Sequence, residues 1–393
     1  MTEPGGDRVS LAVIAGEWLR IGVTGFGGPP AHIAQLRRLC VEQRHWLSPE
    51  EFEDGIAATS LLPGPTSTQL AIFCGWRLRG TRGALVAGVC FILPGLVIIL
   101  GLAALFLASH PPRWLRGVAA GAGAGVPAVA VAAALGFLPA SWRRVRGARG
   151  RRTRWMAYLA AGVACVAVAG QYLVVVLLAC GLIEAAVQRP ALARRRDGPR
   201  GGPPGLLPLA AALPAAGGVG ALAWVALKVG GLSFGGGFVI IPLMQHDAVN
   251  AYHWMTSAQF LNAVALGQVT PGPAVLTVSV VGYAAWGVRG GLLAALVAFA
   301  PSFAFIIAGA RHFDRLRRSA RAQAFLTGAG ACAIGGIGGA AVPLALGLSH
   351  LWQAGTTALA AAWLIGLRRG VVSALAGGGA LGAIAALAHA PLL

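Results

Sequence analysis

Apolar stretches long enough to cross a lipid bilayer recur along this chain, and they restrict its fold more than any other feature. A membrane-spanning helix needs about 20 mainly apolar residues. The longest apolar stretches cover residues 84–107, 115–138, 156–187, 292–310 and 371–388. Only 11% of the residues are charged, whereas a soluble domain carries about 25%. The sequence therefore predicts an all-α integral membrane protein, because a helix satisfies its own backbone hydrogen bonds in lipid.

The charged residues are unevenly distributed. The chain has 31 basic and 12 acidic residues, and its formal net charge is +19. Many arginines gather between apolar stretches, at 143–154 and 194–200. Arginine-rich segments of this kind stay on the cytoplasmic side and orient a membrane protein. We therefore expect the basic residues to lie beside the lipid bilayer and not to bind nucleic acid. Whether they also attract anions stays open.

A set of motifs occurs twice, 208 residues apart. The pairs at this spacing are Phe26-Gly27-Gly28 with Phe234-Gly235-Gly236, Trp46 with Trp254, Phe52 with Phe260, Pro63-Gly64-Pro65 with Pro271-Gly272-Pro273, Gly83 with Gly291, and Phe91 with Phe299. So long a register indicates duplication. We predict two homologous halves of about five transmembrane helices each: an N-terminal repeat at 1–187, a polar linker at 188–204, and a C-terminal repeat at 205–393.

The basic residues also suggest how the two halves are oriented. In the first half they directly follow the Pro-Gly-Pro span, between Arg77 and Arg82; in the second they follow one helix later, between Arg311 and Arg321. If both groups are cytoplasmic, equivalent helices run in opposite directions, which is an inverted repeat. Whether residues 156–187 form one long helix or two short ones stays open.

Each Pro-Gly-Pro motif lies in an apolar region, where proline and glycine interrupt a helix. Matching broken or re-entrant helices in two halves are typical of a transport site, and the N-terminus of a half-helix offers free N–H groups to an anion. The candidate substrate-binding residues are Phe26, Gly27, Gly28, Pro63, Gly64, Pro65, Thr66, Ser67, Thr68, Phe234, Gly235, Gly236, Thr270, Pro271, Gly272 and Pro273. Alternatively, the motifs are packing kinks, and the Phe-Gly-Gly glycines only allow close helix approach.

Ionisable residues near the breaks are candidates for ion coupling, because charge is costly inside a bilayer. They are His32, His246, Asp247 and Lys228. The alternatives are that 31–53 is a solvated interfacial helix and that Lys228 reaches the membrane surface. The sequence carries no nucleotide-binding loop, zinc signature or nucleophile elbow. We therefore expect no cofactor, no metal and no enzymatic activity.

Both halves resemble the chromate ion transporter family in its long, two-domain form. The first half carries FGGPPAHIA, RHWLSPEEFEDG and LLPGPTSTQLA, and the second carries GGLSFGGGFVIIPLMQHDAVN, HWMTSAQFLNAVALGQVTPGP and VGYAAWGVRGG. The resemblance covers essentially the whole chain. It implies a multi-pass protein of the bacterial inner membrane that exports chromate, confers chromate resistance and uses the proton-motive force. Gln69, Gln259 and Asn262 stand where this family often has acidic residues, which speaks against a carboxylate-based proton step.

Together, these observations predict secondary active transport of a tetrahedral oxyanion, with chromate efflux first and transport of sulfate or another oxyanion second. A passive anion channel and an integral-membrane enzyme acting on an anionic lipid are the competing functions. A homodimer is compatible with the sequence. The preferred anion, the direction of transport and the coupled ion are not determined by it.

Overall fold

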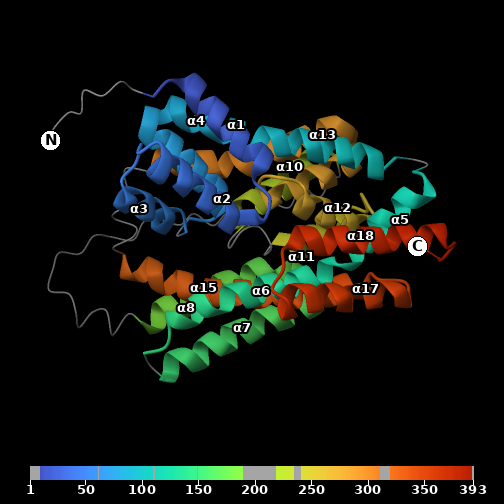
Figure 1. Ribbon diagram of the computed structural model, residues 1–393. Coiled ribbons are helices and arrows are strands. Elements are labelled where there is room, and N and C mark those ends of the chain that lie inside the picture. Colours follow the sequence, from blue (N-terminus) through green and yellow to red (C-terminus); the bar gives the residue numbers. More distant parts are fainter. Residues whose placement is uncertain are drawn as a thin grey trace, which may run out of the picture.

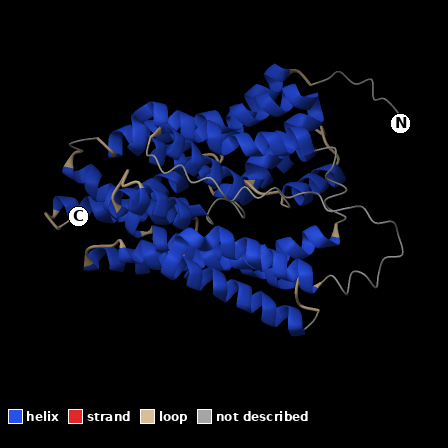
Figure 2. Ribbon diagram, turned by 180° about the vertical axis from the view of Figure 1, so that it is seen from behind, coloured by secondary structure: helices blue, strands red, loops and turns tan. Residues whose placement is uncertain are grey.

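The structure is a computed structural model that describes residues 9–60, 62–108, 111–147, 149–188, 218–233, 240–309 and 319–391. Within these ranges the chain forms helices and turns but no strand, as Figure 2 shows. Four helical segments of the described residues are long and apolar enough to cross a membrane: Thr66–Phe106, Arg113–Arg143, Ala274–Gly309 and Ala320–Leu346. Shorter apolar helices cover Leu173–Val187, Val219–Leu232 and Val371–Leu387. The predicted all-α membrane fold is confirmed.

The helices of the first half precede the polar segment, most of which lies outside the described residues. They are α1 (Leu11–Thr24), α2 (Gly28–Arg37), the π-helix η1 (Arg38–Gln43), α3 (Pro49–Thr59), α4 (Thr66–Phe106), α5 (Arg113–Ala124), α6 (Val126–Arg143), α7 (Arg149–Ala169), the 3₁₀ turn η2 (Gly170–Tyr172) and α8 (Leu173–Val187). The region 156–187 thus forms two helices, α7 and α8, joined by η2.

The second half repeats the order of these elements. They are α10 (Val219–Leu232), α11 (Ile241–Gln245), the π-helix η4 (His246–Ala251), α12 (Ser257–Val269), the 3₁₀ turn η5 (Ala274–Leu276), α13 (Thr277–Gly309), α15 (Ala320–Gly339), α16 (Ala341–Leu346), α17 (Leu351–Ala361), the π-helix η7 (Ala362–Gly366) and α18 (Val371–Leu387). Helices α1 and α10 begin and end 208 residues apart, as do η1 and η4. The duplication is therefore visible in the elements themselves.

The register of the duplication shifts by one residue after the second Pro-Gly-Pro. Gly80 and Gly287, both at φ 58°, lie at equivalent turns and are 207 residues apart. The expected pairing of Gly83 with Gly291 and of Phe91 with Phe299 is therefore wrong by one position. The 3₁₀ turn η5 has no counterpart at the start of α4. A 3₁₀ helix rises about 2.0 Å per residue against 1.5 Å in an α-helix, so it covers the same distance with fewer residues.

Helices α4 and α13 each fold back on themselves. At Gly80 the backbone reaches φ 58°, ψ −146°, a region that essentially only glycine occupies. Gly75 packs against Gly83 and Ala87 across this turn, so segments 66–78 and 81–106 are antiparallel neighbours. The same reversal occurs at Gly287, where φ is 58° and ψ is −153°.

Each Pro-Gly-Pro forms the tip of a second, shorter hairpin. Gly55 of α3 packs against Leu70 and Phe73, which places α3 beside the first segment of α4. Pro63-Gly64-Pro65, between these two helices, is called the first tip below. In the second half α12 approaches the start of α13 in the same way, and Pro271-Gly272-Pro273 is the second tip. The predicted interruptions are therefore present as re-entrant hairpins.

The long segments that follow the two tip hairpins run in opposite directions. Gly88 packs against Phe303, and Gly291 packs against Leu100, so segment 81–106 is antiparallel to segment 288–309. These segments are equivalent in the two halves. An antiparallel arrangement of equivalent helices is what an inverted repeat predicts.

The two halves also exchange their peripheral helices. Helix α5 of the first half packs mainly against α18 of the second, while α15 of the second half packs against α7 and α8 of the first. Figure 1 shows α1, α4, α10 and α13 in one layer and α6, α7, α8, α15 and α17 in another. Because helices cross between the halves, the two repeats form one packed body.

Candidate functional site

The first tip leads directly into the N-terminus of α4. The first N–H groups of a helix have no acceptor within it, and here Pro65 at the N-cap supplies no side-chain hydrogen bond. Ser67 and Thr68 in the first turn are almost completely buried. A buried helix N-terminus presents N–H groups and the positive end of the helix dipole, which favour an anion.

Polar atoms without a hydrogen-bond partner surround this tip. Among the described residues, Thr68 Oγ1, Gln69 Oε1 and Ser302 Oγ are buried and make no hydrogen bond. A methyl group added at Gly64 would lie 3.1 Å from Ser302 Oγ and would meet the Gln69 amide. Leaving such a group unpaired costs about 1–3 kcal/mol. The first tip therefore has the unused hydrogen-bonding capacity expected of a ligand site.

His32 connects the tip region to the Phe-Gly-Gly motif of the first half. Its Nε2 lies 2.8 Å from the Gly25 carbonyl oxygen and its Nδ1 lies 3.3 Å from Ser67 Oγ. The carbonyl can only accept, so Nε2 carries the proton, and in the neutral ring Nδ1 accepts from the Ser67 hydroxyl. The ring is fully buried and contacts Phe91 edge-on at 5.1 Å between centroids. A protonation change at His32 would thus reverse its hydrogen bond to the start of α4.

The carbonyl of Gly25 joins the two halves. It also accepts a hydrogen bond from the backbone N–H of Gly272 in the second tip, at 3.0 Å. The second tip in turn packs against Gly95 of α4, through Pro271. Gly95 and Ser302 are equivalent residues, 207 positions apart. Gly64 of the first tip lies beside Ser302 of the second half, and Pro271 of the second tip lies beside Gly95 of the first half. Each tip therefore contacts the long segment of the opposite half.

The remaining expected site residues have different surroundings. The hydroxyl of Thr270 donates to the Leu266 carbonyl oxygen at 2.7 Å. Thr277, which was not among the expected residues, likewise donates to the Ala274 carbonyl oxygen at 2.8 Å. Gly27 and Gly28 start α2, and Phe26 is about half exposed. Phe234, Gly235 and Gly236 lie outside the described residues.

The coupling candidates of the second half take part in an ion pair. Lys228 Nζ of α10 lies 2.5 Å from Asp247 Oδ2 of η4, and His246, next in sequence to Asp247, is only partly buried. In the first half Glu17 of α1 pairs with Arg44, just after η1, at 2.6 Å. Each half therefore fixes its first helix to its π-helix by a salt bridge, although the acidic and basic partners have changed places.

Sequence reasoning missed Ser302, Ser233 and Ser279. All three hydroxyls are buried and without a partner among the described residues. Ser302 follows Pro301 inside an apolar span. A polar residue beside a mid-helix proline is the signal that would have identified it.

The comparison with protein families agrees with this architecture. The sequence model of the family described as "Chromate transporter" matches residues 12–185 and 220–383, one region in each half. The chain belongs to the chromate transporter family. Members of this family are ion transporters, and this one is a multi-pass membrane protein.

Similar chromate-family proteins cover most of the chain. A chromate transport protein of Cupriavidus metallidurans is 32% identical over 341 residues, 84% of this chain and 81% of that protein. A probable chromate transport protein of Synechococcus elongatus is 29% identical over 369 residues, 91% of both chains. A chromate transport protein of Pseudomonas aeruginosa is 30% identical over 361 residues, 86% of this chain and 82% of the relative. No solved structure matches.

Proposed function

We propose that this protein is a secondary active transporter that exports a tetrahedral oxyanion, chromate first, across the bacterial inner membrane, driven by the proton-motive force. Family membership and relatives named as chromate transport proteins support the cargo. The observation that carries the proposal is the first tip, where buried polar groups without a partner lie at the start of a helix.

A dianion at the first tip would accept hydrogen bonds from N–H groups at the start of α4 and from the hydroxyls of Thr68 and Ser302. Backbone and hydroxyl donors stabilise negative charge strongly where water is excluded. Gln69 Nε2 already donates to the Pro63 carbonyl at 2.7 Å. Its free Oε1 can only accept a hydrogen bond, so it would not bind an oxygen of the dianion itself but would suit the protonated oxygen of the singly charged acid form.

His32 is the proposed coupling residue. Proton uptake would turn Nδ1 from an acceptor into a donor and would force the Ser67 hydroxyl to rotate. This change occurs in the first turn of α4, beside the proposed anion site. We propose that Lys228 and Asp247 hold η4 against α10 and affect coupling only through that contact. We propose that His246, next to Asp247, is not required for coupling.

Energised everted membrane vesicles test the function directly. Vesicles that contain the protein should accumulate labelled chromate, a protonophore should abolish this uptake, and sulfate should compete. Vesicles without the protein provide the background. Uptake equal to this background would exclude chromate export.

Sulfate transport is the second candidate, because two tetrahedral dianions offer the same oxygen acceptors to the first tip. Growth on chromate distinguishes the two functions. An exporter of chromate protects cells that express it, whereas an importer that accepts chromate as a sulfate analogue sensitises them.

A further inference from the structure

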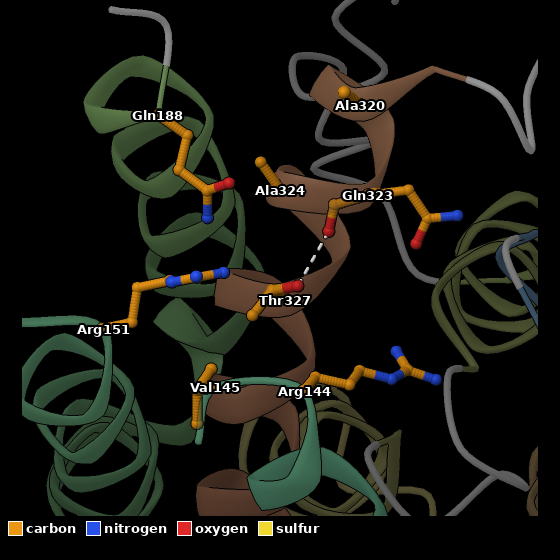
Figure 3. A pocket seen from close by; sticks show the side chains of 8 residues that line it. All are labelled: Arg144, Val145, Arg151, Gln188, Ala320, Gln323, Ala324 and Thr327. Carbon is orange, nitrogen blue, oxygen red and sulfur yellow. Dashed lines mark hydrogen bonds between the residues drawn. The ribbon is translucent and has the colours of Figure 1, made fainter. Parts of the chain in front are cut away.

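A cavity lined by two arginines lies far from the tips in sequence, at the ends of α6, α7, α8 and α15. Its volume is about 490 Å³, within the range of small-ligand pockets (about 300–1,000 Å³). The residues that line it are Arg144, Val145, Arg151, Gln188, Ala320, Gln323, Ala324 and Thr327. Figure 3 shows Arg151 pointing toward Thr327, with the Gln188 amide above it, whereas the Arg144 side chain points away from both. None of the lining residues is acidic.

Neighbouring arginines are already used by the protein, whereas those of the cavity are not. Arg154 makes two hydrogen bonds to Glu184, at 2.7 and 3.0 Å, and Arg152 lies over the Trp142 ring. Among the described residues, Arg144 and Arg151 take part in no ion pair. The nearby carboxylate of Glu184 is neutralised by Arg154 and also accepts hydrogen bonds from Tyr158 and Gln188. No carboxylate among the described residues therefore compensates the two positive charges of the cavity.

Exposed apolar side chains lie directly beside this cavity. Val187, which precedes Gln188, is 46% exposed, and Ile183, one helical turn earlier, is 51% exposed. Exposed apolar side chains on a membrane helix contact acyl chains. A ligand that places an anionic group at Arg151 and an acyl chain along α8 would match both surfaces.

We propose that this cavity binds the phosphate group of an anionic phospholipid, with Arg151 and Gln188 at the phosphate and Arg144 at the opening of the cavity. Thr327 only lines the cavity, because its hydroxyl donates to the Gln323 carbonyl at 2.8 Å. Arginine suits phosphate because its guanidinium donates two parallel hydrogen bonds. Basic pockets between membrane helices on the cytoplasmic side fit such head groups. The site is independent of the transported anion, and its expected effect is to hold α8 of one half against α15 of the other.

Thermal unfolding of the purified full-length protein in detergent tests the site. Short-chain phosphatidylglycerol should raise the unfolding midpoint saturably, and phosphatidylcholine of equal chain length should not. The double variant R144A/R151A should bind phosphatidylglycerol about tenfold more weakly, which corresponds to about 1.4 kcal/mol, because charge-assisted hydrogen bonds to the phosphate are lost. The control R143A/R149A removes the same charge from the same segment outside the cavity and should bind as the wild type does.

Two further measurements distinguish the source of the phosphate and exclude misfolding. If inorganic phosphate stabilises the wild type saturably and R144A/R151A abolishes this stabilisation, the cavity is still a phosphate site, but its ligand is free phosphate. The variant R144K/R151K keeps the charge and should retain part of the affinity, which separates lost binding from lost folding. Absence of saturable stabilisation by either ligand, or equal losses in the two alanine double variants, would overturn the proposal.

Discussion

The two tips share a backbone but differ in their chemistry. Gly64 and Gly272 have similar backbone angles, with φ of 125° and 101°. The first tip is followed by Thr66, Ser67, Thr68 and Gln69, and the second by Ala274, Val275 and Leu276. Ile240 stands at the position equivalent to His32, and Gly95 at that of Ser302. The difference teaches that duplication supplied a symmetric backbone frame. Among the described residues, only the first tip carries the side-chain groups that we propose to bind an anion.

The largest effect is expected from placing a side chain in the first tip. Gly64→Ala adds a methyl group that clashes with Gln69 and Ser302. It also places a residue with a side chain at φ 125°, and this backbone strain alone costs about 1–3 kcal/mol. Chromate uptake in everted vesicles should fall about 100-fold. Gly272→Ala, where the added methyl group meets no atom closer than 3.6 Å, should lose clearly less. Equal losses at matched membrane levels would show the tips to be equivalent.

Replacing His32 comes next in size. His32→Gln should reduce uptake driven by an imposed pH gradient by about tenfold or more, because proton transfer through a positioned histidine is lost. Exchange of labelled for unlabelled chromate, which needs no net proton movement, should fall less. His246→Gln, at a partly exposed position, is the matched control and should retain both activities. Parallel loss of exchange and gradient-driven uptake would make His32 a structural residue only.

Removing the hydroxyl of Ser302 should weaken substrate binding. Ser302→Ala deletes one proposed donor, and one hydrogen bond to a charged ligand accounts for about a tenfold rise in KM with little change in maximal rate. Ser279→Ala removes a hydroxyl of α13 that is equally buried and equally without a partner. Its KM should stay within about twofold of the wild type. A similar KM for both variants would remove Ser302 from the site.

The smallest effect on transport is expected from the Lys228–Asp247 pair. Lys228→Met or Asp247→Asn leaves one buried charge without its partner and should lower the unfolding midpoint by about 3 °C. The double variant should recover most of this loss, and chromate KM should be unchanged in all three proteins. A rise in KM would instead place the pair in the transport pathway of the second half.

The candidate site could be predicted from sequence only in part. Proline and glycine have local conformational consequences, so the breaks at Pro63-Gly64-Pro65 and Pro271-Gly272-Pro273 were predictable from composition and position. The hydroxyls of Thr270 and Thr277 could not be ranked, because each donates to a carbonyl of its own turn, and sequence does not show that choice. Lys228 and Asp247 were expected as separate candidates for ion coupling, and sequence does not show that they pair across α10 and η4.

The sequence by itself determined the membrane fold, the duplication, the two breaks and the family, because apolar length, repeat spacing and proline position are properties of short segments. Only the tertiary structure decided that Ser302 faces Gly64, that Gly25 joins His32 to Gly272, and that α5 and α15 cross to the opposite half. These contacts join residues far apart in the chain. They depend on how two antiparallel halves pack against each other, which no local pattern specifies.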